Sequence, residues 1–163
     1  MIRWITSKLP NSLIIFLWRK LPVSRKFKRN MAHRAARKFL VTVLGIIENE
    51  HGEILLLKHT YREEPWGIPS GLMEYEDPVS GITREIYEET KLNVEITSIL
   101  KANYNSHPDR IDLYYRGKLV SGTFQKSPEI SDYGFFPIDQ LPEGVPIPQR
   151  EILNEYAKGN IGL

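Results

Sequence analysis

Three glutamates crowd the segment "SGITREIYEETKL" (80–92), where Glu85, Glu88 and Glu89 follow Arg84 within about one helical turn. One interpretation is a solvated acidic helix face, because like charges four residues apart destabilise a helix only slightly. The other is a cation site. At a half-buried edge, two carboxylates about 6 Å apart repel each other by roughly 2–3 kcal/mol unless a cation lies between them. Mg²⁺ prefers such oxygen ligands and keeps water molecules that a phosphate can replace.

The neighbouring residues predict a helix that carries these acids on one edge. In "DPVSGITREIYEET", Asp77 is a favoured N-cap residue and Pro78 a favoured first helical residue. Arg84 lies four residues before Glu88 and is placed to hold that carboxylate. At about 100° per residue, one apolar stripe faces a sheet and the acids lie on its flank. The stripe consists of Val79, Ile82 and Ile86.

The rest of the chain alternates predicted strands and helices. Two β-rich runs, "FLVTVLGII" and "EILLLKH", flank "ENEHG", which predicts a hairpin with Gly52 at its turn. Further strands are predicted in "VEITSILKANY", "RIDLYYRGKLV" and "DYGFFPI", and "IPSGLMEYE" is partly strand-like. A closing helix is predicted in "PQREILNEYAKG", ending at Gly159. Mixed strands with helices between and after them predict an α/β fold with layered α/β/α packing.

The amino-terminal segment is strongly basic. Residues 1–40 carry 11 Lys or Arg and no acid, whereas residues 41–163 carry 11 Lys or Arg against 20 Asp or Glu, a net charge of −9. We therefore divide the chain into a basic amphipathic helical arm, 1–38, and a domain, 39–163. The arm is predicted to form one helix before Pro22 and a second in "SRKFKRNMAHRAARKF". Packing on the domain or on a second subunit of a homodimer is favoured, contact with a membrane surface is the next alternative, and nucleic acid is disfavoured.

Composition excludes several classes of protein. At 163 residues, 41% hydrophobic and 26% charged, the chain is typical of an ordinary globular domain. The absence of cysteine excludes disulfides, thiolate metal sites and cysteine nucleophiles. The apolar run Leu13–Trp18 is far shorter than the ~20 residues that span a bilayer. A cytoplasmic location is expected, with a membrane-peripheral position through the arm as the alternative.

The segment "WGIPSGLMEYEDPVSGITREIYEETKL" (66–92) resembles the signature of the Nudix (MutT-type) hydrolase family, Gly-x5-Glu-x7-Arg-Glu-U-x-Glu-Glu-x-Gly-U, in which U is a bulky aliphatic residue. The spacing between Glu76 and Arg84 is kept. The matching positions are Trp66, Pro69, Gly71, Glu74, Glu76, Arg84, Glu85, Ile86, Glu88, Glu89 and Leu92. The resemblance implies a Nudix-type α/β/α sandwich with a mixed sheet, here preceded by the basic N-terminal helical arm.

Three positions depart from the signature. Four residues rather than five separate Gly71 from Glu76. Ser70 stands where relatives carry the first Gly of a pair, whose backbone carbonyl binds metal. Lys91 replaces the Gly that ends the helix, where a left-handed backbone favours glycine by up to ~1 kcal/mol. No acidic ligand is lost, but the first two departures change the loop.

The resemblance implies hydrolysis of a nucleoside diphosphate linked to another moiety, with water attacking phosphorus. The implied cofactor is Mg²⁺, with Mn²⁺ as a substitute, and the implied partner is a small-molecule nucleotide. The metal ligands implied are the side chains of Glu85, Glu88 and Glu89 and the backbone carbonyl of Ser70. The catalytic residues implied are Glu88, Glu89, Arg84 and Glu129.

Several roles stay open between alternatives. The general base is either a helix glutamate or Glu129 on a later loop, with Asp132 as a competitor. Glu76 is expected to support the loop rather than to bind metal. The substrate-contact candidates are Arg62, Trp66 and Gly71. For Trp66 and for Tyr61, packing is the favoured interpretation.

The substrate itself is not fixed by the sequence, and "YNSHPDR" (104–110) is a candidate selector. The four histidines lack metal-ligand spacing and are assigned no catalytic role. Isopentenyl diphosphate isomerases of the same fold use a catalytic cysteine, which this chain lacks. The alternative function is a catalytically silent Nudix-fold module that binds a nucleotide and regulates another process; such modules often lose signature acids, and all are present here.

Overall fold

The computed structural model describes residue 12, residues 24–36 and residues 38–162, and the chain divides into two compact units, Met1–Lys38 and Phe39–Leu163. In the first unit, helix α3 (Arg25–Ala35) lies within the second helix predicted for the arm and has no acid in its first turn. The first helix predicted for the arm lies outside the described residues. In the part of the chain that is described, no helix is long and apolar enough to cross a bilayer.

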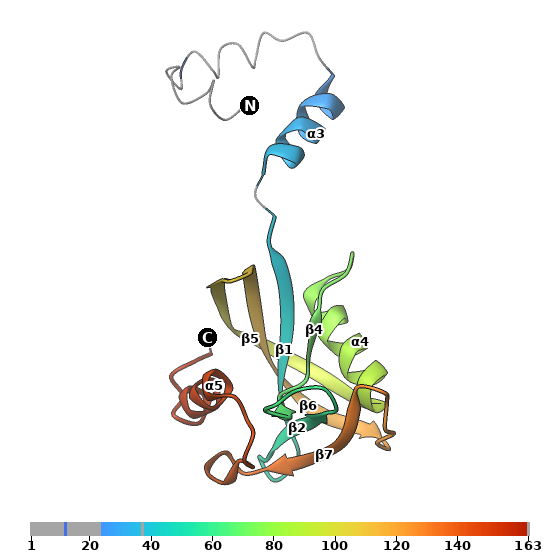
Figure 1. Ribbon diagram of the computed structural model, residues 1–163, viewed down its shortest axis with the longest axis vertical. Helices are drawn as coiled ribbons and strands as arrows, with labels where there is room; N and C mark the ends of the chain where they lie inside the picture. Colours follow the sequence, from blue (N-terminus) through green and yellow to red (C-terminus); the bar gives the residue numbers. More distant parts are fainter. Residues whose placement is uncertain (1–11, 13–23, 37, 163) are drawn as a thin grey trace. The chain divides into compact units, whose positions relative to one another are not determined.

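The second unit is built on a mixed seven-stranded sheet with strand order β3-β2-β1-β6-β5, to which β4 is added beside β1 and β7 beside β2 (Figure 1). Strands β1 and β6 are parallel, and the other pairs are antiparallel. The strands are β1 (Leu40–Glu48), β2 (Ile54–His59), β3 (Trp66–Gly67), β4 (Ser70–Leu72), β5 (Leu92–Ser106), β6 (Asp109–Gly122) and β7 (Ile130–Phe136). The mixed sheet with helices confirms the predicted fold class.

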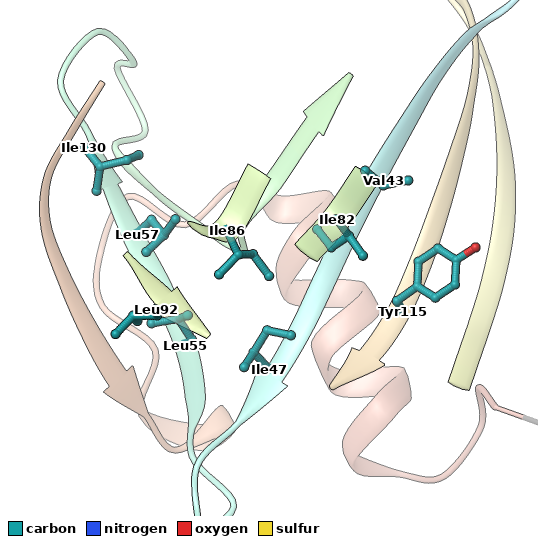
Figure 2. Packing of buried hydrophobic residues seen from close by; sticks show 9 residues of the cluster. All are labelled: Val43, Ile47, Leu55, Leu57, Ile82, Ile86, Leu92, Tyr115 and Ile130. Carbon is teal, nitrogen blue, oxygen red and sulfur yellow. The ribbon is translucent and has the colours of Figure 1, made fainter. Parts of the chain in front are cut away.

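Strand β1 separates two hydrophobic clusters, because alternate side chains point to opposite faces of the sheet. Val43 packs with helix α4 (Pro78–Thr90), whereas Leu44 packs with helix α5 (Ile147–Ala157). Figure 2 shows the cluster on the α4 side, where Ile82 and Ile86 reach the sheet. The sheet is therefore covered on both faces, as the alternation of strands and helices predicts.

Helix α4 begins as the sequence predicts. The Asp77 side chain accepts hydrogen bonds from the backbone N–H groups of Val79 (3.1 Å) and Ser80 (3.0 Å), and Pro78 is the first helical residue. The predicted apolar stripe is wrong at one position, since Val79 is 43% exposed while Ile82 and Ile86 are fully buried. Val79 lies in the first turn, before the helix meets the core.

The predicted hairpin between β1 and β2 is present, but it holds together only at its turn. The chain reverses through Gly52, whose φ is 75°, and Glu48 paired with Ile54 is the only Cα register between the two strands. Beyond that pair the strands separate, because β1 pairs with β4 and β2 pairs with β3 along the edges that face each other. The sheet is thus split, with β4 on one side of the split and β3 on the other.

Candidate active site

The three signature glutamates and the predicted loop acid line one cavity of about 230 Å³. We call it the acidic cavity; its lining is Glu85, Glu88, Glu89, Ser127, Pro128 and Glu129. Helix α4 supplies three of the acids, and the loop before β7 supplies the fourth. Four carboxylates from two separate segments therefore meet where the charge crowding of the sequence predicts a cation site.

The surroundings of Glu89 disfavour the ionised form of its carboxyl group. Its Oε2 atom is buried and has no hydrogen-bond partner among the described residues. Burial, followed by the charges of Glu85 and Glu129, raises the pKa of Glu89 to about 8. Burial also raises the pKa of Glu85, although Arg84 opposes that shift. Both groups would ionise more readily with a cation beside them.

Arg84 holds three acids together. Its Nη2 atom lies 2.7 Å from Glu76 Oε1 and 3.0 Å from Glu85 Oε1, and its Nη1 atom lies 3.2 Å from Glu88 Oε2. The contacts with Glu76 and Glu85 raise the pKa of the guanidinium, and the hydrogen bond from Arg84 lowers the pKa of the Glu76 carboxyl. Arg84 thus stays charged and fixes the rim of the acidic cavity, while Glu76 faces Arg84 as a supporting acid.

Gly71 leaves the space that Glu85 occupies. A Cβ atom at position 71 would lie 2.0 Å from Glu85 Cδ, far inside van der Waals contact. Strand β4 fixes this approach, because Gly71 pairs with Val43 and Ser70 with Leu44 on β1. The shortened loop between Gly71 and Glu76 therefore still brings the strand backbone against the first signature glutamate.

Lys91 ends α4 in a left-handed conformation, with φ 62° and ψ 17°. Its backbone N–H bonds the Tyr87 carbonyl oxygen at 2.9 Å, and its Nζ lies 4.9 Å from the Tyr87 ring centroid. The conformation that the family's glycine usually adopts is thus kept by a lysine. The last turn, with Glu88 and Glu89, is closed in the usual way.

A second cavity, of about 590 Å³, adjoins the acidic cavity and shares Glu85, Glu89 and Glu129 with it. We call it the central cavity; its other polar lining comprises Thr42, Tyr61, Arg62, Ser70, Arg110, Asp112 and Gln149. The cavity opens at the split in the sheet, since it touches both β1 and the segment after β2. Arg62 and Gly71, predicted to contact substrate, both line it.

Comparison with known proteins decides the family. The NUDIX domain model matches residues 38–156, most of the chain. The chain belongs to the NUDIX family. A MutT-like protein of Streptomyces ambofaciens is 27% identical over 104 residues, covering 63% of this chain and 67% of that protein.

Solved structures agree with the NUDIX assignment. A UDP-X diphosphatase superposes with a TM-score of 0.67 and 25% identity, covering 93% of this chain and 80% of that one. A MutT protein from Methanosarcina mazei Go1 gives a TM-score of 0.64 at 22% identity, covering 76% of this chain and 96% of that one, which shows the shared fold. The resemblance inferred from residues 66–92 is confirmed, and the chain is a NUDIX pyrophosphohydrolase.

In this NUDIX domain, the loop before β7 distinguishes the two candidate bases. The Thr60 N–H bonds the Glu129 carbonyl oxygen at 2.9 Å, and Thr60 Oγ1 donates to the Pro128 carbonyl oxygen at 3.0 Å. Glu129 lines both the acidic and the central cavity. Asp132 lies in β7, accepts a hydrogen bond from the Tyr133 N–H and lines neither of these two cavities.

Trp66 lies outside the cluster of site residues. Its ring packs edge-to-face on Phe136, with 5.3 Å between centroids, and it joins the hydrophobic cluster on the α5 side of the sheet. It lines neither the acidic nor the central cavity. Packing, the interpretation favoured for Trp66 from the sequence, agrees with this position.

His59 is buried, and burial with nearby Arg62 lowers its pKa to about 4, so it stays neutral.

Two polar residues of the NUDIX site were not predicted from the sequence. Gln149, in the first turn of α5, accepts a hydrogen bond from the Ile68 N–H at 2.9 Å and lines the central cavity. Asp112 is 4% exposed and also lines it. Asp112 could have been found from the sequence, because it is a charged residue on the same strand face as the buried Tyr114. Gln149 could not have been found in this way, because nothing in "PQRE" shows which strand the helix meets.

The site fits a divalent cation in charge and donor chemistry. Among the described residues, no three acidic or histidine side chains are already gathered to the spacing of a metal-ligand group. The acids instead share a cavity, and one buried Glu89 oxygen lacks a partner. Hard oxygen donors with raised pKa values suit Mg²⁺, which retains water molecules and tolerates a partly protein-made shell.

Proposed function

We propose that this NUDIX protein is a Mg²⁺-dependent hydrolase of nucleoside diphosphates linked to a second moiety, X, with Mn²⁺ as a substitute ion. The oxygen of water bonds to one phosphorus, and the bridging P–O bond to that phosphorus breaks. The bridging oxygen leaves with the other phosphate, so the products are a nucleoside monophosphate and X-phosphate. The solved relative named a UDP-X diphosphatase, 25% identical to this chain, supports this class of substrate.

The observation that carries the proposal is the meeting of four carboxylates in the acidic cavity, with a buried, unpartnered oxygen on Glu89. Glu85, Glu88 and Glu89 would hold the ion, with the Ser70 carbonyl as a further donor. When bound, Mg²⁺ neutralises charge on phosphate oxygens and makes water more acidic. A domain with net charge −9 over residues 41–163 would otherwise repel such a substrate.

The protein's own side chains are assigned separate roles in this reaction. Glu129 faces both cavities and is assigned the role of the base that takes the proton from water. Arg84 keeps Glu85 and Glu88 in place. Arg62 lines the central cavity beside these acids and is assigned to substrate phosphate. Glu76 fixes Arg84 and has no direct role in the reaction.

A substrate panel with single Glu→Gln variants tests the proposal. The wild type is assayed with nucleoside diphosphate sugars, dinucleoside polyphosphates and nucleoside triphosphates, each with Mg²⁺ and with Mn²⁺. We expect hydrolysis of at least one compound and losses of several orders of magnitude in Glu88→Gln and Glu89→Gln. Glu95→Gln, an exposed acid of β5, is the matched control and should retain full activity.

The panel also separates the proposal from its alternative. If the wild type hydrolyses no compound with either ion but binds one of them, the protein is a silent nucleotide-binding module. Full activity in both Glu88→Gln and Glu89→Gln would contradict the assignment of the acidic cavity.

A further inference from the structure

Another cavity adjoins the central one on the α5 side. It has a volume of about 400 Å³ and shares four lining residues with the central cavity, Leu44, Arg110, Asp112 and Gln149. We call it the outer cavity. The acidic, central and outer cavities therefore form a row, each sharing lining residues with the next.

Strand β5 supplies much of the polar lining of the outer cavity. Lys101, Asn103 and Asn105 are alternate residues of that strand, so their side chains share one face of the sheet. All three are half-buried, whereas the intervening Ala102 and Tyr104 are exposed. This pattern builds a wall of hydrogen-bonding groups opposite α5. Part of the segment 104–110, the candidate selector of the sequence, thus borders a cavity next to the proposed reaction centre.

The charges in the outer cavity nearly cancel. Lys101 Nζ lies 2.7 Å from Glu155 Oε2, and Arg110 Nε lies 2.6 Å from Asp112 Oδ1. With Glu151, the charged groups of the lining sum to −1. A cavity with this balance disfavours a further polyanionic chain and accepts a neutral group rich in hydrogen-bond donors and acceptors.

The outer cavity also lacks a surface on which a base could stack. Among the described residues that line it, the aromatic one is Tyr114, which is 6% exposed. The central cavity differs, because Tyr61 is 62% exposed and the Arg62 guanidinium carbon lies 5.5 Å from its ring centroid. A planar base is better accommodated beside Tyr61, and a hydroxyl-bearing ring beside Asn103.

Arg110 stands where the central and outer cavities meet. Asp112, nearly fully buried, pairs with it through Nε, at 2.6 Å, and through Nη2, at 3.0 Å. Asn105 donates to Asp112 as well, at 2.6 Å. No hydrogen bond from Arg110 Nη1 is formed within the described part of the chain. Asp112 therefore positions a guanidinium whose remaining amino group can bind a phosphate.

We propose, on the basis of the function above, that moiety X is a neutral polyhydroxylated group such as a sugar ring, and that it binds in the outer cavity. Arg110 binds the phosphate attached to it, and the nucleoside lies at the Tyr61 end of the central cavity. Asp112 is a positioning residue that holds Arg110. The substrate class is then a nucleoside diphosphate sugar rather than a dinucleoside polyphosphate or a nucleoside triphosphate.

The test compares ligands that differ only in X. Full-length ¹⁵N-labelled protein, with Ca²⁺ in place of Mg²⁺ to slow turnover, is titrated with ADP-ribose and with the β-methyl ester of ADP. UDP-glucose and the β-methyl ester of UDP form a second pair. We expect the amide signals of Lys101, Asn103 and Asn105 to shift in a saturable manner with the sugar nucleotides and not with the methyl esters.

Matched variants give a second readout. Asn103→Leu should weaken binding of both sugar nucleotides by about 5–10-fold, the loss of one or two hydrogen bonds, and change methyl ester binding by less than about twofold. Asn93→Leu, an exposed asparagine of the same strand outside the outer cavity, should change neither. Arg110→Lys should weaken all four ligands by a similar factor, because each carries the same phosphate.

The inference is overturned if the Lys101, Asn103 and Asn105 signals respond to both members of a pair, to neither member, or if no ligand binds. Turnover with Mg²⁺, measured separately on the wild type, distinguishes the two proposals. Sugar-specific shifts without hydrolysis would refute the proposed activity and leave the binding site standing. Hydrolysis without sugar-specific shifts would refute the outer cavity as the site for X and leave the activity standing.

Discussion

At the scale of single residues, Glu89 links structure to chemistry most directly. It is largely buried, one of its oxygens has no partner among the described residues, and its pKa is raised to about 8 by burial and by Glu85 and Glu129. Such a carboxyl is unfavourable in the folded protein without a cation nearby. The metal-free protein should therefore carry a measurable penalty that depends on pH.

Glu89→Gln should flatten the pH dependence of stability in EDTA. The pKa of Glu89 is about 8 when folded against an ordinary value of 4.5, so the folded state holds the proton more tightly. Its contribution is fully present below pH 4.5 and is lost as pH rises through 8. Between pH 5 and 8.5 the wild type should lose a few kcal/mol more unfolding free energy than the variant, measured by urea denaturation. Parallel curves would contradict this, and Glu95→Gln should follow the wild type.

Glu129→Gln and Asp132→Asn separate the two candidate bases. Glu129 lines the acidic and central cavities, whereas Asp132 lines neither. We expect Glu129→Gln to lower kcat by about 10²–10⁴-fold while the Mg²⁺ concentration for half activity changes little. Asp132→Asn should keep kcat within about twofold of the wild type, since exposed substitutions away from a site have small effects. Equal kcat values in the two variants would refute Glu129 as the base.

The residues of the site differ in how much of the chain must be known to predict their positions. Glu85, Glu88, Glu89 and Arg84 lie within one helix, so their spacing alone predicts that they meet. The choice of Glu129 over Asp132 depends on how Thr60 holds the loop, a contact between residues distant in sequence. Gln149 depends on the packing of α5, which no local pattern records.

At the scale of elements, α4 and β4 act together. Gly71 on β4 allows Glu85 to lie against the strand backbone, since a Cβ there would be 2.0 Å from Glu85 Cδ. The helix ends in the left-handed conformation that the signature's glycine favours, although the residue is Lys91. The departures from the family signature are thus absorbed locally, and the acids stay in place.

Lys91→Gly and Lys91→Ala should differ in stability in a defined order. Position 91 has φ 62°, which glycine adopts without the steric penalty of a Cβ. Both variants lose the contact of Nζ with the Tyr87 ring, so that term cancels between them. The glycine variant should be more stable than the alanine variant by about 1 kcal/mol, measured by thermal or urea unfolding. Equal stabilities would show that the turn relaxes away from this conformation.

The elements themselves were largely predictable. Periodicity and capping residues predicted α4 and α5, and strand-like runs predicted β5 and β6, the second by its alternation of apolar and polar residues. The separation of β1 from β2 was not, because it depends on β4 pairing with β1 and β3 pairing with β2 along the facing edges, and the β1–β4 contact joins residues distant in sequence. Val79 was wrongly predicted to be buried, because the angular position of a residue on a helix does not show at which turn the helix meets the core.

At the scale of the whole domain, the split in the sheet creates the site. The two hydrophobic clusters lie on opposite faces, and the central cavity opens where β1 and β2 part. Glu85 and Glu89 come from α4 on one face, and Gln149 comes from α5 on the other. Binding of an ion or a substrate in these cavities should therefore stabilise the fold as a unit.

Mg²⁺ should raise the melting temperature of the wild type and not that of Glu89→Gln. An ion present at 100 times its Kd adds about 2.7 kcal/mol to the unfolding free energy, or roughly 5–11 °C in melting temperature for a protein of this size. The measurement is differential scanning fluorimetry at pH 7.5 in Mg²⁺ and in EDTA, with NaCl added to match ionic strength. An equal rise in both proteins would show that the ion binds elsewhere.

The row of cavities has a consequence for how such a protein diversifies. The groups assigned to hydrolysis belong mainly to residues 70–90, whereas Lys101, Asn103, Asn105 and Arg110 belong to the β5–β6 hairpin (Figure 1). Exchanging that hairpin between homologues should then transfer substrate preference without changing the residues that are assigned to hydrolysis. Chimeras of this kind would show whether selectivity and reactivity evolve as independent traits in this scaffold.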